Sequence, residues 1–276
     1  MLRSQTDNRQ MNLLAFDTST EHLSVALQSG GNGGAPQQWA FSGPGGAQAS
    51  TTLIPAIQRL MQQAGLDYPD LAAIAFGAGP GSFTGLRTAC SVAQGLAFAA
   101  NVPVLPVDSL MAVAEDARLQ RLQPLQEAAS TPHDALPDHA LPDTDLSVVA
   151  MLDARMDELY VARYTFRSKV WITDEAPSLM RPEDVAARIN LAASGDGDDE
   201  PPVIFAGNVF AHYGQRLNFP EKGCQNALPA APAMLRLASQ LLRQGLAVRA
   251  DQALPLYIRD KVAKTTEERL REKAAA

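Results

Sequence analysis

Apolar and polar positions follow two different rhythms along the chain, and their order predicts an α/β protein. Apolar runs of about five residues that end in turn residues predict strands, whereas longer stretches with apolar residues three and four apart predict helices. In the first half, strands are predicted over residues 13–17, 24–28, 38–41, 71–76 and 102–107, and helices over 51–63 and 85–100. In the second half, the pattern predicts a hairpin over 146–166, strands over 170–173 and 203–206, a helix from residue 182 and further helices up to residue 246.

The start of each half carries a faint internal repeat. Residues 13–28, LLAFDTSTEHLSVALQ, align without a gap on residues 149–164, VAMLDARMDELYVARY, and this alignment matches Asp17 with Asp153 and Leu23 with Leu159. Both copies show an apolar run, an Asp at its end, a polar turn and an alternating strand. The repeat predicts two lobes of related fold.

A glycine-rich turn follows the apolar run that ends at residue 76. The segment over residues 76–87, FGAGPGSFTGLR, reads as a strand, a sharp turn and the start of a helix that Ser82 or Thr84 could cap. It has neither the Lys-Ser/Thr of a Walker phosphate loop nor the spacing of a dinucleotide fingerprint. Two interpretations stay open: an anion-binding helix terminus, or a tight turn that lets a helix pack close to a sheet.

Composition shifts divide the chain. We expect a disordered polar tail over residues 1–11, a first lobe over 12–115, a Pro-rich linker or insertion over 123–145 and a second lobe over 146–255. The C-terminal segment, 256–276, could return to the first lobe before it ends in a charged tail.

Overall composition favours a protein of the cytoplasm. Only Cys90 and Cys224 are present, in different predicted lobes, so a disulfide framework is not expected. No stretch approaches the roughly eighteen uninterrupted apolar residues of a membrane helix. The net charge of −7 and the pI of about 5.1 argue against nucleic-acid binding by this chain alone.

Two lobes that each open with a hairpin ending its first strand in Asp resemble the actin, sugar-kinase and heat-shock chaperone (ASKHA) superfamily. That resemblance implies a two-lobed actin-like, or ribonuclease H-like, ATPase fold in which each lobe is a mixed sheet flanked by helices. Within the superfamily, the chain resembles most the TsaB (YeaZ) family, whose members are subunits of the bacterial machinery for N6-threonylcarbamoyladenosine in tRNA. The motifs that carry this resemblance lie at residues 14–21, 77–87, 93–97, 107–110, 152–160 and 256–259.

The resemblance implies a partner subunit that is not an enzyme by itself. It would dock the transferase TsaD through first-lobe helices and help to bind the ATPase TsaE. The complex would move the threonylcarbamoyl group from threonylcarbamoyl-AMP to the adenosine beside the anticodon of tRNAs that read codons beginning with A. ATP and Mg²⁺ would be used by the complex and no cofactor by this chain alone, tRNA would be reached only through the complex, and a homodimer is possible in isolation.

A metal-dependent transferase is not expected. TsaD, the catalytic paralogue, is known for a His-x-x-x-His pair on a helix, and the matching helix here, residues 48–55, has no His, Asp or Glu. No two of the four histidines lie four residues apart; they are His22, His133, His139 and His212.

An ATP-dependent small-molecule phosphotransferase is the alternative function. Asp17 and Asp153 could then place magnesium and a water. The candidate phosphate-turn residues are Asp17, Thr18, Ser82 and Thr84. Against this function, Asp153 is followed by Ala154 and Arg155 rather than by the Gly of a second phosphate turn. The two Asp turns would otherwise simply be capped turns, in which each carboxylate accepts neighbouring backbone N–H groups.

The two first-lobe helices are apolar on more than one face. Helix 51–63 has more apolar positions than a single stripe requires, and helix 85–100 is almost free of charge. Such helices are either buried inside the chain or covered by a partner, and the family resemblance favours the partner. The predicted interface residues are Leu53, Ile57, Leu60, Met61, Ala89, Ala93, Leu96 and Ala97.

Overall fold

Two five-stranded mixed sheets with the same strand order form the protein. The computed structural model describes residues 11–30, 36–128, 144–189, 201–220 and 223–259. Sheet one has the order β3 (Gln37–Pro44), β2 (His22–Ser29), β1 (Leu13–Asp17), β4 (Ala73–Gly79) and β5 (Val104–Asp108). Sheet two repeats it as β8 (Val170–Met180), β7 (Leu159–Arg167), β6 (Leu146–Asp153), β9 (Val203–Gly207) and β10 (Cys224–Asn226). In each sheet the first three strands in sequence order form an antiparallel meander. The fourth and fifth strands run parallel to the first.

The strand pairing confirms the internal repeat and corrects its alignment. Asp17 lies opposite Ser24 in the first hairpin, whereas Asp153 lies opposite Leu159 in the second. The second hairpin therefore closes with one residue fewer in its turn. The match of Leu23 with Leu159 holds in the structure, because both side chains lie in the outer core of their sheet. The first strands are shifted by one residue instead, since Phe16 shares its outward direction with Met151 and not with Leu152.

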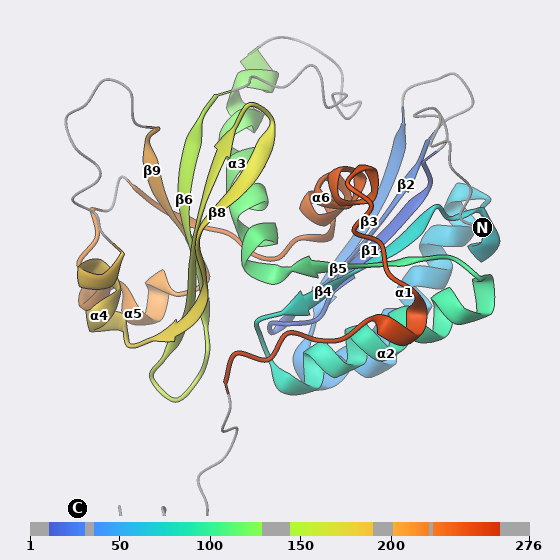
Figure 1. Cartoon of the computed structure of the whole chain (residues 1–276), viewed down its shortest axis with the longest axis horizontal. Helices are drawn as coiled ribbons and strands as arrows, with labels where there is room; N and C mark the ends of the chain where they lie inside the picture. Colours follow the sequence, from blue (N-terminus) through green and yellow to red (C-terminus); the bar gives the residue numbers. More distant parts are fainter. Residues whose placement is uncertain (1–10, 31–35, 129–143, 190–200, 221–222, 260–276) are drawn as a thin grey trace, which may run out of the picture.

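The sheets and helices alternate as five layers (Figure 1). α1 (Ala49–Ala64) and α2 (Phe83–Ala100) cover the outer face of sheet one. α4 (Pro182–Arg188) and α5 (Phe210–Leu217) cover the outer face of sheet two. Between the sheets lie α3 (Ser109–Ala128) and α6 (Ala231–Arg243), which pack on each other in one apolar core shared by both sheets. Short 3₁₀ turns occur at Gly46–Gln48, Tyr68–Asp70 and Ala250–Gln252.

α3 was not expected from the sequence. It continues to Ala128, so the linker predicted from residue 123 begins inside a helix. The first half of α3 is apolar on several faces, because it is buried between the two sheets, and it therefore lacks the single stripe by which an amphipathic helix is recognised. The rest of the predicted linker, residues 129–143, lies outside the described residues, as do residues 1–10 of the predicted N-terminal tail and the charged C-terminal tail. Met11, the last residue of that predicted tail, is instead buried in the core shared by both sheets.

The chain returns to the first lobe earlier than expected. The sequence pattern places residues 231–243 in the second lobe, but the buried residues of α6 pack against β1 and β2. The Ala231 backbone N–H also donates to Ser24 Oγ on β2, at 2.8 Å. After α6, Val248 bridges to Val104 on the free edge of β5. The physical reason is that sheet one needs an apolar cover on its inner face, and α6 supplies it.

A buried ionic cluster joins the central helices to sheet two. Glu115 on α3 is 2% exposed and accepts two hydrogen bonds from Arg118, each of 2.8 Å. It also accepts one from Trp171 Nε1 on β8, at 2.9 Å, and one from Arg236 Nε on α6, at 3.0 Å. Three elements that are distant in sequence are thus fixed by a single carboxylate.

In the part of the chain that the structure describes, no helix combines the length and the apolar character needed to cross a membrane.

Candidate functional site: the cleft between the lobes

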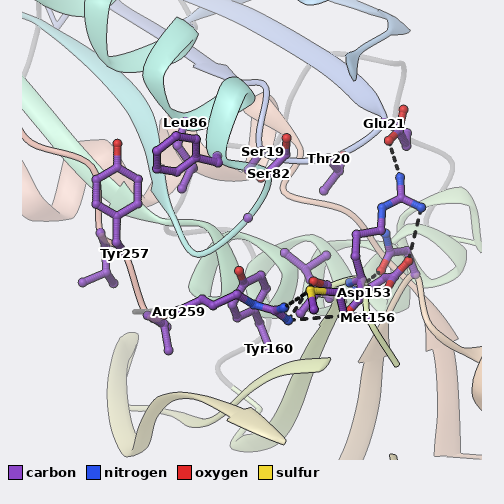
Figure 2. Close-up of a pocket in the computed structure, with 18 residues that line it drawn as sticks. Ser19, Thr20, Glu21, Ser82, Leu86, Asp153, Met156, Tyr160, Tyr257 and Arg259 are labelled. Carbon is purple, nitrogen blue, oxygen red and sulfur yellow. Dashed lines mark hydrogen bonds and ion pairs between the residues drawn. The ribbon is translucent and has the colours of Figure 1, made fainter. Parts of the chain in front are cut away.

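A cleft of about 400 Å³ opens between the lobes, beside the turns that follow β1 and β6 (Figure 2). Its first wall comes from the turn after β1 and the start of α2, and its second wall from the turn after β6 together with Tyr160 and Asn208. The remaining side is formed by the C-terminal strap, which we define as residues 253–259. This cleft corresponds to the position at which the sequence places its two Asp turns.

Both carboxylate oxygens of Asp17 accept hydrogen bonds from residues of the first lobe or of α3. Its Oδ1 accepts the Ser19 backbone N–H at 2.7 Å and the Ser19 hydroxyl at 2.6 Å, and its Oδ2 accepts the Ser109 hydroxyl at 2.9 Å. Thr18 is also buried, and its hydroxyl donates to the Gly85 carbonyl oxygen at 2.7 Å. The oxygens that would contact magnesium or phosphate are therefore already hydrogen-bonded within the chain.

The start of α2 lies directly against this turn. The Ser82 backbone N–H donates to the Ser19 carbonyl oxygen at 2.7 Å, and a Cβ on Gly85 would lie only 1.9 Å from the Thr18 carbonyl oxygen. Glycine is thus required here for close packing of the helix on the turn. Of the two candidate hydroxyl residues at this helix start, Ser82 lines the cleft, whereas Thr84 is exposed to solvent and does not line it. Ser82 is the N-cap residue of α2, but its side chain makes no capping hydrogen bond.

The second turn has an unusual backbone. Arg155, Met156 and Asp157 all have left-handed φ values, of 61°, 56° and 63°, and none of them is glycine. Asp153 begins the turn by accepting the Arg155 backbone N–H at 2.8 Å, as Asp17 does for Ser19. Non-glycine residues in this region are strained and persist only where their surroundings hold them. The sequence contains no glycine or proline signal that would have revealed this conformation.

Three separate contacts hold the second turn. The guanidinium of Arg155 pairs with Glu21 across the cleft, and Arg216 Nη2 on α5 donates to Asp157 Oδ2 at 2.8 Å. Arg259 of the strap donates to the carbonyl oxygens of the turn itself. The guanidinium of Arg216 lowers the pKa of the Asp157 carboxyl through the hydrogen bond.

Burial raises the pKa of Asp17 from 3.8 to about 6, although its hydrogen bonds with Ser19 and Ser109 oppose the rise. A raised pKa means that Asp17 stabilises the fold most below pH 4, and that this contribution is lost as the pH rises towards 6. We expect Asp17→Asn to remove this dependence, because the amide oxygen can still accept from Ser19 and the amide nitrogen can donate to Ser109. Relative to the variant, the wild type should lose roughly 2 kcal/mol of unfolding free energy between pH 4 and pH 7. Urea denaturation at several pH values measures this difference, and a difference that stays constant with pH would contradict the shift.

The structure places the predicted interface residues mostly in the core. Seven of them are buried beneath α1 and α2 against sheet one, and only Leu96 is half-buried; the seven are Leu53, Ile57, Leu60, Met61, Ala89, Ala93 and Ala97. In the isolated chain these side chains are not available to a partner. The physical reason is that both helices need an apolar inner face to cover the sheet, which accounts for most of the apolar positions read from the sequence.

The outer face of α2 nevertheless carries no charge beyond its first turns. After Arg87, its exposed positions are Ser91, Gly95, Phe98 and Ala99, and the Phe98 side chain is 83% exposed. Half-buried Val92 and Leu96 flank them. A surface of small and apolar residues on a helix that already buries its inner face is typical of a contact region.

No group of three or more His, Cys, Asp or Glu side chains among the described residues is arranged to hold a metal ion.

Comparisons with known proteins support the family resemblance. The chain is 30% identical over 255 residues to the tRNA threonylcarbamoyladenosine biosynthesis protein TsaB of Escherichia coli (strain K12), over 92% of this chain and 96% of that protein. It is 33% identical over 258 residues to TsaB of Haemophilus influenzae, with the same two coverages. The solved structure of YeaZ from Pseudomonas aeruginosa aligns with a TM-score of 0.68 and 32% identity, over 90% of this chain and 99% of that one. The family model of TsaD, tRNA N6-adenosine threonylcarbamoyltransferase, matches residues 46–136.

Proposed function

Because the chain belongs to the TsaB family of tRNA threonylcarbamoyladenosine biosynthesis proteins, we propose that it acts as the subunit that docks the transferase TsaD and carries out no chemistry by itself. The single observation that carries this proposal is the uncharged outer face of α2. The predicted site therefore shifts from the buried side chains to Ser91, Gly95 and Phe98, while Leu96 keeps its place at the edge.

The similarity of the first lobe to the TsaD family supports TsaD as the partner. The TsaD family model matches residues 46–136, which include α1 and α2, so the transferase family contains a related pair of helices. Two related lobes can pair helix against helix about an approximate twofold axis. In the absence of TsaD, the same face would allow two copies of this chain to pair.

The wider role remains the one that the family implies. In this proposal the complex also holds TsaE, uses ATP and Mg²⁺, works in the cytoplasm and transfers the threonylcarbamoyl group to adenosine in tRNA. With a net charge of −7, this chain is expected to contribute little to tRNA affinity, so the partners bind the nucleic acid.

The phosphotransferase alternative has less support. Asp17 and Thr18 are buried and neither lines the cleft, and their side-chain oxygens are hydrogen-bonded to Ser19, Ser109 and Gly85. Ser82 alone is left facing the cleft among the four candidate residues.

A charge on the outer face of α2 tests the docking function. Ser91→Glu should leave the melting temperature within about 2 °C of the wild type, because surface substitutions change stability little. It should weaken the binding of TsaD at least about tenfold, because the carboxylate would be buried without a counter-ion. Calorimetric titration of the chain with purified TsaD measures the affinity, and Thr173→Glu, on exposed β8 of the other lobe, is the matched control. Normal binding by the Ser91 variant would place the docking surface elsewhere.

A further inference from the structure

The C-terminal strap crosses from the first lobe to the second along one side of the cleft (Figure 1). On the first lobe, the Ala253 carbonyl oxygen accepts from Gln94 Nε2 on α2 at 2.8 Å. The Leu256 backbone N–H then donates to the Ala78 carbonyl oxygen at the end of β4, at 2.7 Å. At Gly79, which has a φ of +118°, a Cβ would lie 2.6 Å from the Leu256 carbonyl oxygen. The absence of a side chain at Gly79 thus allows the backbone of the strap to pack directly on the end of β4.

Arg259 attaches the strap to the second lobe. Its Nη2 donates to Glu158 Oε2 at 2.7 Å, to the Ala154 carbonyl oxygen at 3.1 Å and to the Arg155 carbonyl oxygen at 3.3 Å. Figure 2 shows the side chain of Arg259 reaching across the cleft towards Met156 and Tyr160. The side chain is only 12% exposed, so its ion pair with Glu158 is weakly screened by solvent.

We propose that this strap is an intramolecular latch, in which Arg259 is the positioning residue that holds the cleft mouth closed and sets the start of α2 for docking. The part that concerns docking rests on the function proposed above.

The contacts at the cleft mouth show why Arg259 dominates there. At the back of the cleft the lobes share one apolar core, and the Tyr164 hydroxyl of sheet two donates to Asp108 of sheet one at 2.7 Å. At the mouth, besides the latch, the lobes are joined by the Arg155–Glu21 pair, whose side chains are 67% and 69% exposed. Exposed pairs contribute little because water screens them. Arg259 also binds two carbonyl oxygens of the strained left-handed turn, and its loss would leave that turn held by the exposed pairs of Arg155 with Glu21 and of Arg216 with Asp157.

The strap also contacts the start of α2. The Tyr257 ring packs on Phe83 with their centroids 5.2 Å apart, and Arg87 Nε donates to the Tyr257 hydroxyl at 3.1 Å. The Arg87 guanidinium stacks on the Phe83 ring at 3.7 Å from its centroid. The same segment therefore touches the second lobe at Arg259 and the first turn of α2 at Tyr257, so that opening the mouth would displace the end of the proposed docking helix.

The test uses the full chain with Arg259→Ala, Arg259→Lys and the matched control Arg249→Ala, whose exposed ion pair with Asp251 lies just before the strap. We expect amide hydrogen exchange of residues 154–158 and 254–259 to become about tenfold faster in the alanine variant, while β1 and α1 keep wild-type protection. Lysine keeps the charge but lacks the planar fork, so its exchange should be intermediate. The affinity for purified TsaD should fall by about tenfold in the alanine variant, with Arg249→Ala unchanged.

Each outcome decides one part of the proposal. Unchanged exchange in both Arg259 variants would overturn the latch. Faster exchange with normal TsaD affinity would overturn the link between the latch and docking. If wild-type chain does not bind TsaD, the docking function fails, and the exchange data still decide whether the latch exists. If Arg259→Ala also loses protection in β1 and α1, the chain has unfolded, and Arg259→Lys then decides by the same criteria.

Discussion

Glu115→Ala is expected to lower the free energy of unfolding by about 3–5 kcal/mol, the usual cost of leaving buried charges without their partner. The substitution would leave the guanidinium of Arg118, which is buried on α3, without its bidentate acceptor. It would also leave Trp171 Nε1 without its acceptor, and Arg236 would lose the hydrogen-bond acceptor of its Nε. Because typical domains have a total stability of only 5–15 kcal/mol, much of the margin would be lost.

Urea denaturation followed by circular dichroism measures this loss. Glu183→Ala is the matched control, since Glu183 pairs with Arg216 on the exposed surface of α4, where ion pairs contribute about 0–1 kcal/mol. If the two variants lost similar amounts, the buried cluster would not be the tie between α3, α6 and β8 that its geometry indicates.

Leu53→Arg is expected to unfold the chain rather than to block docking alone. Leu53 on α1 is fully buried against sheet one, so an arginine there would both lose apolar packing and place an unpaired charge in the core. Large-to-small changes at such positions already cost about 2–5 kcal/mol, and a buried charge adds to this. Ala93→Glu on α2 should act in the same way, since Ala93 is also fully buried.

Melting by circular dichroism beside size-exclusion chromatography separates the two outcomes. Gln58→Arg on the exposed face of α1 is the control that carries the same charge on the same helix. A folded Leu53 variant that has lost only its partner would mean that α1 moves away from sheet one when the complex forms.

The length of the apolar runs was enough to predict the strands of the first lobe. Each of them is present in sheet one, because a run of about five apolar residues between turn residues is too short for a helix, and length decides where periodicity is ambiguous. The two Asp residues do end equivalent strands beside one cleft, as the repeat indicated. The direction in which apolar residues face could not be obtained in this way. A buried inner face and a partner surface give the same apolar pattern on α1 and α2, and only the packed structure separates them.

Other features depend on contacts between distant parts of the chain. The left-handed turn over residues 155–157 is held by Glu21, Arg216 and Arg259, which lie far from it in sequence. Local propensity contains no information about such contacts. For the same reason, the sequence places α6 in the second lobe although it packs on sheet one. The apolar stripe of an amphipathic helix shows that the helix covers a sheet, but it does not show which sheet.

The placement of α6 has a consequence for the order of events during synthesis. Sheet one is complete in sequence by Asp108, yet the apolar helix that packs against β1 and β2 begins only at Ala231. A ribosome adds about 5–20 residues per second, and domains usually fold as they emerge. The first lobe of this protein cannot complete its folding in this way, because the inner face of β1 and β2 stays without α6 while more than a hundred further residues are made. Nascent chains therefore expose that face for several seconds, and this interval is when they would most need a chaperone.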